Sequence, residues 1–352
     1  MNFASDNVTG ACPEVLQALI AANEGSALPY GNDPLTEGVE AQLVALFGCD
    51  LRAFPVATGT AANALALACL TPPYGAIYCH AESHINVDEC GAPELMTGGA
   101  KLVPLAGAAG KLTPQTVAEA IQGAGVVHHV QPAVLALTNE TEAGTLYRPE
   151  ELAALAAVAR ERGLKVHLDG ARFANAVAAL GCTAADLTWR AGIDVLSFGA
   201  TKNGCLCAEA VVFFDKAAAE AFPYHRKRAG HLFSKMRMLS AQLSGYLADD
   251  VWLRNARHAN AMAGRLAERL AALPGCHLLY PAEANEVFVA LPPAAIERLR
   301  GAGFQFYEWA PGQLRLVCAW NTAERDVAAF LDTATQAVAA GEAARRHDSA
   351  AR

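Results

Sequence analysis

The segment Asp194 to Cys207, DVLSFGATKNGCLC, places a single lysine just after an apolar run. Residues 195–198 have the composition of a buried strand, and Lys202 follows within four residues. Open α/β sheets bind ligands beyond the carboxyl ends of their strands, where a partly desolvated amine is a nucleophile. Lys202 is therefore a candidate nucleophile. The alternative is a surface lysine in a turn.

A second candidate, Asp169, stands at the end of another apolar run, 165–169. A carboxylate in that position is poorly solvated unless it meets a cation or a protonated ring nitrogen. Pyridoxal phosphate (PLP) suits both residues, because its pyridinium nitrogen pairs with an aspartate and its aldehyde forms a Schiff base with a lysine. Asp169 and Lys202 together predict PLP as the cofactor.

The remaining parts of a PLP site also have candidates. Thr58, Gly59 and Thr60 precede an Ala-rich helical pattern, so backbone N–H groups at the helix start favour a phosphate; the alternative is an ordinary N-cap. His84 is placed to stack on the ring and exchange a proton, or it is a capping or core-edge histidine.

Two arginines are candidates for binding a carboxylate, because a planar guanidinium can hold one in bidentate fashion. Arg172 lies three residues after Asp169, and Arg315 lies between Leu314 and Leu316 in a strand-like context. Alternation places Arg315 on the opposite face from these leucines, so it either reaches a ligand or is a surface residue of a half-buried strand.

The elements that must position these residues alternate between two kinds of segment. Short apolar runs predict strands at 76–80, 133–139, 165–170, 194–199 and 210–215. Helical patterns lie at 59–70, 113–125 and 148–163. This alternation predicts an α/β fold with a mostly parallel sheet and helices on both faces.

The length of 352 residues exceeds the ~250–300 at which one core stops growing, so two domains are expected. From about Leu239 the pattern changes to long helical stretches, followed by strand candidates at 286–291 and 313–320. We expect a large domain over 1–240 and a smaller α+β domain over 241–352.

Composition excludes several function classes. A net charge of −8 argues against a nucleic-acid surface, and no apolar stretch is long enough for a membrane helix. The N-terminus lacks a secretory signal, and the ten cysteines are scattered, which predicts free thiols and a cytoplasmic location. No compact His, Cys and Asp set indicates a metal site. The basic cluster His225 to Arg237 is either a solvated helix face or an anion-binding segment.

With these residues assembled, the chain resembles the L-threonine aldolase family of fold-type-I PLP enzymes, to which low-specificity threonine aldolases and phenylserine aldolases belong. The resemblance covers nearly the whole chain and rests on SDNVTG (5–10), YGNDPLT (30–36), TGTAAN (58–63), ESHI (82–85), LTNETEAGT (137–145), HLDGARFANA (167–176), SFGATKNG (197–204) and LRLVCAW (314–320). Many relatives instead carry Ser-Lys-Gly-x-Gly where this chain has TKNGCLC, and a triple-glycine loop where it has HLFSKMR.

The resemblance implies a role for each matching residue. The cofactor-binding residues it implies are Gly59, Thr60, His84, Asp169, Arg172 and Lys202, with Lys202 as the Schiff-base lysine. The substrate-binding residues it implies are Ser5, Tyr30, Asp33, Arg172 and Arg315, of which Tyr30 and Asp33 would line the site of a neighbouring subunit. His128 matches a histidine near the substrate hydroxyl, so His84, His128 or a water ordered by both is the candidate base.

The implied reaction is retro-aldol cleavage of L-threonine, L-allo-threonine or a related β-hydroxy-α-amino acid such as phenylserine, giving glycine and an aldehyde. The resemblance also implies a homodimer or homotetramer with shared active sites. A different PLP reaction, such as β-elimination, racemisation or transamination, would use the same Lys202 and Asp169. A PLP-binding protein without turnover is the other alternative.

Overall fold

The computed structural model describes the backbone of residues 1–350 and the side chains of residues 1–341. The chain forms two compact units, which we describe separately. Unit 2 comprises Gly10–Glu142 and Leu146–Leu253, and unit 1 comprises Met1–Thr9, Ala143–Thr145 and the chain from Arg254 onward. Residue 240, the expected domain end, lies inside helix α10 (Arg237–Leu247) of unit 2.

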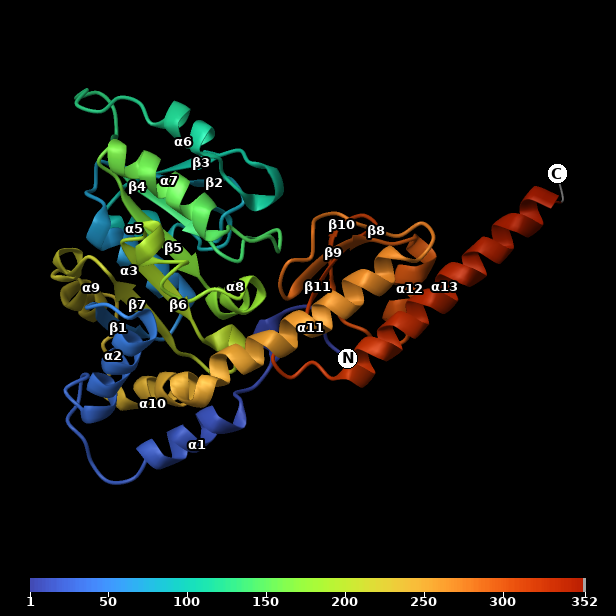
Figure 1. The fold of residues 1–352 in the computed structure, drawn as a ribbon, viewed down its shortest axis with the longest axis horizontal. Helices are drawn as coiled ribbons and strands as arrows, with labels where there is room; N and C mark the ends of the chain where they lie inside the picture. Colours follow the sequence, from blue (N-terminus) through green and yellow to red (C-terminus); the bar gives the residue numbers. More distant parts are fainter. Residues whose placement is uncertain (351–352) are drawn as a thin grey trace. The chain divides into compact units, whose positions relative to one another are not determined.

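Unit 2 is built on a seven-stranded sheet in the order β1-β7-β6-β5-β4-β2-β3 (Figure 1). Its strands are β1 (Arg52–Val56), β2 (Gly75–His80), β3 (Lys101–Leu105), β4 (Gln131–Thr138), β5 (Lys165–Gly170), β6 (Val195–Gly199) and β7 (Glu209–Phe213). Only β7 runs antiparallel to its neighbours. The predicted mostly parallel sheet is confirmed.

The helices of unit 2 cover both faces of this sheet. They are α1 (Pro13–Ala22), α2 (Pro34–Phe47), α3 (Gly59–Leu70), α4 (His84–Val87), α5 (Ala92–Thr97), α6 (Pro114–Ala120), α7 (Pro149–Glu161), α8 (Phe173–Leu180), α9 (Phe222–Arg228) and α10. Val195 faces a core formed with α3 and α9. Three positions along, Phe198 faces the other side, where its ring packs against Phe47, Phe173 and Tyr246.

Unit 1 contains a four-stranded antiparallel sheet in the order β10-β11-β9-β8. Its strands are β8 (His277–Leu278), β9 (Glu286–Ala290), β10 (Tyr307–Ala310) and β11 (Gln313–Val317). Its helices are α12 (Pro293–Gly301), α13 (Glu324–Ala350) and the part of α11 (Val251–Ala271) that follows Leu253. The predicted small α+β unit is present.

The N-terminal segment Met1–Thr9 is part of unit 1. The Phe3 N–H donates to the carbonyl of Gln305 at 2.8 Å, and the Val317 N–H donates to the carbonyl of Phe3 at 2.8 Å. The Phe3 ring is buried and packs edge-on against Phe330. This N-terminal segment therefore contributes a central side chain to the core of unit 1.

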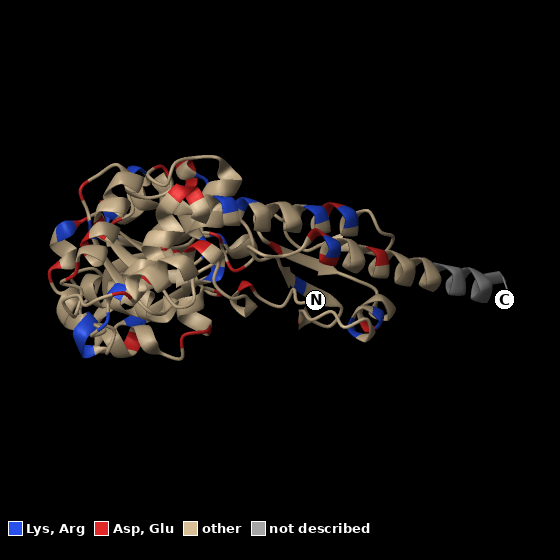
Figure 2. Ribbon diagram, turned by 90° about the horizontal axis from the view of Figure 1, so that it is seen from below, with Lys and Arg blue, Asp and Glu red and all other residues tan. Residues whose placement is uncertain are grey.

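Surface chemistry agrees with the charge pattern of the sequence. Lys and Arg residues are interspersed with Asp and Glu over the ribbon (Figure 2). Between residues 1 and 341 all ten cysteines are free thiols, with four of them buried. Within the described chain no helix is both long enough and apolar enough to span a bilayer.

Candidate functional site

The carboxyl edge of the large sheet gathers the chemistry-bearing segments. Thr138, Asp169 and Ser197 share one register row across β4, β5 and β6. Val56 at the end of β1 and Gly199 at the end of β6 both pair with Glu209 of β7. Because β1, β4, β5 and β6 run in the same direction, the segments that follow them leave from the same edge.

Lys202 lies three residues beyond β6, in a 3-10 turn over Thr201–Asn203. The turn is fixed from both sides: the Ala200 N–H donates to Glu209 at 2.7 Å, and the Asn203 amide donates to the Tyr246 hydroxyl at 2.6 Å. The Lys202 side chain itself forms no hydrogen bond or ion pair with any described residue. A rigid turn therefore presents an uncommitted amine.

Asp169 is buried at the end of β5, and in the described part of the chain its hydrogen-bond donors are neutral groups. The Asn63 amide donates to Oδ2 at 2.7 Å, and the Ala171 N–H donates to Oδ1 at 2.9 Å. Within the described residues no lysine or arginine forms an ion pair with this carboxylate. His167, on the same strand, donates to or accepts from the Ser197 hydroxyl at 3.0 Å, and burial lowers its pKa to about 4.

His84 opens the short helix α4 and has a half-exposed side chain. Its backbone N–H donates to Glu142 at 2.8 Å, and its Nδ1 lies 2.8 Å from Oε1 of the buried Glu89. The pKa of His84 is raised, first by the hydrogen bond to Glu89 and then by the charge of Asp169, while burial and the charge of Lys202 oppose the rise. His84 is therefore within electrostatic reach of Asp169 and of Lys202.

The start of α3 is a candidate anion site. The Thr58 hydroxyl caps the helix by accepting from the Ala61 N–H at 3.2 Å. The N–H groups of Gly59 and Thr60, at the first two helical positions, have no acceptor among the described residues. Space in front of Gly59 is open, because an added Cβ would meet nothing within 4 Å. Thr58 is thus an N-cap, and the two N–H groups beside it remain available, so the anion site stays a prediction.

Part of the basic cluster 225–237 reaches the end of β1. Arg226 is buried, donates to the carbonyl of Pro55 at 3.3 Å and stacks over the Phe54 ring. Burial lowers the pKa of Arg226 to about 10. His231 accepts from the Ala57 N–H at 3.3 Å. The cluster is thus not a wholly solvated helix face, because Arg226 brings a buried positive charge to the segment before Gly59.

The three carboxylate-binding candidates belong to different units. Arg172 is buried in unit 2 at the start of α8. Ser5 and Arg315 are in unit 1. The Ser5 hydroxyl accepts from the Asn7 N–H at 3.1 Å, and Arg315 pairs with Glu286 of the neighbouring strand.

Tyr30 and Asp33 lie in the loop before α2. Tyr30 has a positive φ of 61°, and Lys227 lies over its ring at 4.8 Å. Asp33 is buried and caps α2, with Oδ1 accepting from the Thr36 N–H at 3.0 Å. Within one chain, Asp33 therefore has a structural role as the N-cap of α2.

His128 lies at the other edge of the sheet. Its exposed turn precedes Gln131, the first residue of β4, whereas Thr138, which pairs with Asp169, ends that strand. Seven residue steps of a strand span roughly 23 Å. One chain therefore does not bring His128 to Asp169 and Lys202. His128 can act on this chemistry only from a second copy.

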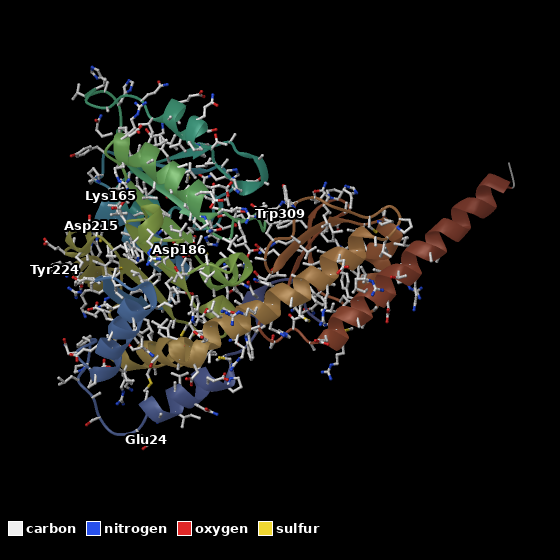
Figure 3. All side chains as sticks on the ribbon, in the orientation of Figure 1. Glu24, Lys165, Asp186, Asp215, Tyr224 and Trp309 are labelled. Atoms are coloured by element: carbon white, nitrogen blue, oxygen red, sulfur yellow. The ribbon has the colours of Figure 1, made fainter. Side chains whose placement is uncertain are left out.

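Charged side chains at the amino edge of the large sheet form ion pairs, unlike Lys202 and Asp169 at its carboxyl edge. Lys165 at the start of β5 lies 2.8 Å from Asp215 and 3.3 Å from Asp194. Figure 3 labels Lys165 and Asp215. These partly buried charges neutralise one another. At the carboxyl edge, Lys202 and Asp169 form no ion pair with any side chain of residues 1–341, which is the pattern of a ligand site.

Sequence reasoning missed the buried polar residues behind the site. Asn63, Glu89 and Glu209 are buried, and Glu142 beside them is partly exposed. Burial raises the pKa of Glu142 and of Glu209 to about 7, against hydrogen bonds that lower it. The available signal for a site carboxylate was its place at the end of an apolar run. Glu89 and Glu142 follow polar segments instead, so nothing in the sequence indicated that they support the site.

The donor set fits PLP. An uncommitted amine at Lys202, a buried carboxylate at Asp169 that only neutral groups contact, and two unused N–H groups at the start of α3 match its aldehyde, ring nitrogen and phosphate. His84 supplies a half-exposed ring beside these groups. No set of three or more His, Cys, Asp or Glu side chains in the described region could hold a metal.

Comparison with known proteins points the same way. The family described as beta-eliminating lyase matches residues 2–292. The chain is 46% identical over 326 residues to a low specificity L-threonine aldolase from Pseudomonas sp. (strain NCIMB 10558), covering 92% of this chain and 94% of that one. It is 47% identical over 321 residues to its counterpart from Pseudomonas aeruginosa, covering 91% and 93%. A solved threonine aldolase from Leishmania major superposes with a TM-score of 0.90 at 28% identity, covering 96% of this chain and 99% of that chain.

Proposed function

This chain belongs to the low-specificity L-threonine aldolases of the beta-eliminating lyase family, which are fold-type-I PLP-dependent enzymes, and we propose that it cleaves L-β-hydroxy-α-amino acids. The substrates are L-threonine, L-allo-threonine and related compounds such as phenylserine. The products are glycine and an aldehyde. The observation that carries the proposal is that Asp169 and Lys202 lie at one edge of the sheet, where hydrogen bonds through Asn63 and Glu89 join Asp169 to His84.

Four parts of unit 2 hold the cofactor in this proposal. Lys202 would attach PLP covalently, Asp169 would accept from its ring nitrogen, His84 would stack on the ring, and Gly59 and Thr60 would donate backbone N–H groups to its phosphate. Bound PLP supplies an electron-withdrawing ring that stabilises negative charge at the substrate Cα. The neutral donors on Asp169 leave its negative charge available to that ring nitrogen.

His84 is the proton-transfer residue that this protomer offers. Its Nδ1 is occupied by Glu89, so Nε2 is the atom that can accept the proton of the substrate β-hydroxyl. Removal of that proton starts cleavage of the Cα–Cβ bond. His128, the other candidate, would contribute only from a second copy of the chain.

The substrate carboxylate is assigned to Arg172, Arg315 and Ser5, as the family resemblance implies. Two arginines suit this role because each presents several N–H donors in a fixed plane. Holding the carboxylate sets which bond to Cα is aligned for cleavage. Arg172 also serves the cofactor side in this proposal, since it follows Asp169 by three residues.

The test is aldehyde release with glycine formation from L-threonine, L-allo-threonine and phenylserine, in the presence of PLP. The wild type should release acetaldehyde or benzaldehyde, and Lys202→Ala should release none. Lys101→Ala, an exposed lysine of β3, is the matched control and should keep wild-type activity. Ammonia or a keto acid in place of aldehyde would indicate a different PLP reaction, and a wild type that binds PLP without any product would overturn catalysis.

We propose that the chain forms at least a homodimer, and either a dimer or a tetramer, with shared active sites. Exposed apolar residues support this. Leu16 and Ile20 lie on α1, Leu28 lies beyond it, and Val127, next to His128, is 91% exposed. Ten free thiols support a reducing, cytoplasmic location. Light scattering that finds a fully active single chain would contradict the assembly.

A further inference from the structure

Four side chains form a continuous hydrogen-bonded chain behind the proposed site. His84 Nδ1 lies 2.8 Å from Glu89 Oε1, and the Asn63 amide nitrogen lies 2.8 Å from that same oxygen. The Asn63 amide nitrogen also lies 2.7 Å from Asp169 Oδ2. Residues of α4, α3 and β5 are joined in this way, with Glu89 between α4 and α5.

We propose that Glu89 is a positioning residue that, together with Asn63, fixes the ring of His84 with its proton on Nδ1 and leaves Nε2 as the proton acceptor. This inference rests on the proposed function, because it assigns the support of the same histidine. Neither Glu89 nor Asn63 contacts a substrate in this account. Both act through His84 and Asp169.

The direction of the hydrogen bonds follows from the amide of Asn63. Its nitrogen carries two protons and can only donate, so Glu89 and Asp169 both accept. The Asn63 carbonyl oxygen is buried without a hydrogen-bond partner. Turning the amide around would place that oxygen against two carboxylates, so its orientation is fixed.

Glu89 Oε1 accepts a hydrogen bond from the Asn63 amide, and the same oxygen accepts a hydrogen bond from the protonated Nδ1 of His84. A neutral imidazole carries a single ring proton, so Nε2 then holds a free lone pair. This is the arrangement by which a carboxylate orients a catalytic histidine in hydrolytic triads. The Glu89 side chain is fully buried, which strengthens its interaction with the ring.

Four ionisable groups from the neighbouring elements surround His84. Glu89 hydrogen-bonds its ring, Glu142 accepts from its backbone N–H, and Asp169 and Lys202 act through space. Asp169 stabilises the protonated ring and Lys202 opposes it. Glu89 is the first cause of the raised pKa of His84, so removing its charge should lower that pKa.

The experiment follows the imidazole nitrogens of the PLP-loaded, full-length protein by ¹⁵N-edited NMR over a pH titration. His84→Asn assigns the His84 signals. In the wild type, the neutral form of His84 should be protonated at Nδ1 and unprotonated at Nε2. Protonation at Nε2 instead would overturn the proposal, and this measurement needs no variant of Glu89.

Glu89→Gln keeps an oxygen acceptor but removes the charge, and Asp88→Asn is the matched control on the adjacent, exposed residue. We expect Glu89→Gln to lower the pH midpoint of His84 and to cost part of the ~10²–10⁴-fold that a positioned acid–base group contributes to kcat. Glu89→Asp should restore the midpoint in part. An unchanged midpoint in Glu89→Gln, or an equal change in Asp88→Asn, would overturn the inference.

The two proposals fail in different ways. A wild type without aldehyde release would contradict the proposed function while leaving the tautomer of His84 as measured. Normal aldehyde release with an unshifted His84 in Glu89→Gln would contradict only the role of Glu89. A change in KM without a change in kcat or in the His84 midpoint would also count against that role.

Discussion

Arg315 and Glu286 form an ion pair across two strands of the small sheet, in which two guanidinium nitrogens meet one carboxylate oxygen. Nε and Nη2 of Arg315 lie 2.8 and 2.6 Å from Oε1 of Glu286, whose side chain is fully buried. The guanidinium carbon of Arg315 lies over the ring of Trp309, 6.0 Å from the centre of that ring. Figure 3 labels Trp309. The pair holds one edge of the guanidinium plane and leaves Nη1 without an acceptor in the described chain.

We predict that Arg315→Lys weakens substrate binding, because an ammonium cannot keep Glu286 and a carboxylate in the same plane. A hydrogen bond between charged groups contributes ~1.5–3 kcal/mol, which corresponds to a rise in KM of ~10–100-fold. Steady-state kinetics with L-threonine measures this. Arg298→Lys, on the exposed side of α12, should leave KM unchanged. A wild-type KM in Arg315→Lys would contradict the role of Arg315 in binding the substrate carboxylate.

Asp169→Asn should lower kcat while the protein stays folded. The variant keeps one oxygen for the Asn63 amide, but its own amide meets the Ala171 N–H, so one hydrogen bond is lost together with the charge. We expect a loss of ~10–100-fold in kcat at saturating PLP, from the ~1.5–3 kcal/mol of a charged hydrogen bond. Titration of PLP absorbance and of aldehyde release checks this. Full activity would show that the charge of Asp169 is not used.

Gly199→Ala should disrupt the turn that carries Lys202. A Cβ at this position would lie 2.4 Å from the backbone oxygen of Ala171, so β6 and the segment after β5 would have to separate. Overpacking of this kind costs ~1–3 kcal/mol. Thermal unfolding and aldehyde release should both fall. Gly264→Ala in α11, where an added Cβ meets nothing within 4 Å, is the control and should unfold no earlier than the wild type.

Much of the large sheet was predictable because its strands are buried on both faces. The predicted runs 165–170 and 194–199 correspond to β5 and β6 to within one residue, and the predicted helix 59–70 is α3. The two edge strands were harder to predict. β3 contains Pro104 and is mostly half-buried or exposed, and β1 contains Pro55, so neither shows a continuous strand pattern.

The site was predictable only in part, for a physical reason. Lys202 and Asp169 end apolar runs, so their position at a sheet edge follows from local sequence. Asn63 and Glu89 are 106 and 80 residues from Asp169 in the chain, and their contacts depend on how α3 and the loop after α4 pack. The N-terminal strand-like segment of unit 1, with Phe3 in its core, is a similar case of contact between distant parts of the chain.

Glu209 predicts a specific dependence of stability on pH. Burial raises its pKa to about 7 in the folded protein, while hydrogen bonds from Thr201 and Ala200 and the charge of Lys202 limit the rise. An unfolded glutamate titrates near ~4.3, so between that pH and about 7 the folded state binds more protons than the unfolded state. The free energy of unfolding therefore falls as pH rises through this window, by an amount on the order of 4 kcal/mol at most. Glu209→Gln keeps an acceptor for the Ala200 N–H and cannot ionise, so its melting temperature should fall less between pH 5 and pH 8 (~3 pH units) than that of the wild type. Glu82→Gln, at an exposed position, should behave as the wild type does, and an undiminished fall in Glu209→Gln would show that Glu209 does not titrate in this window.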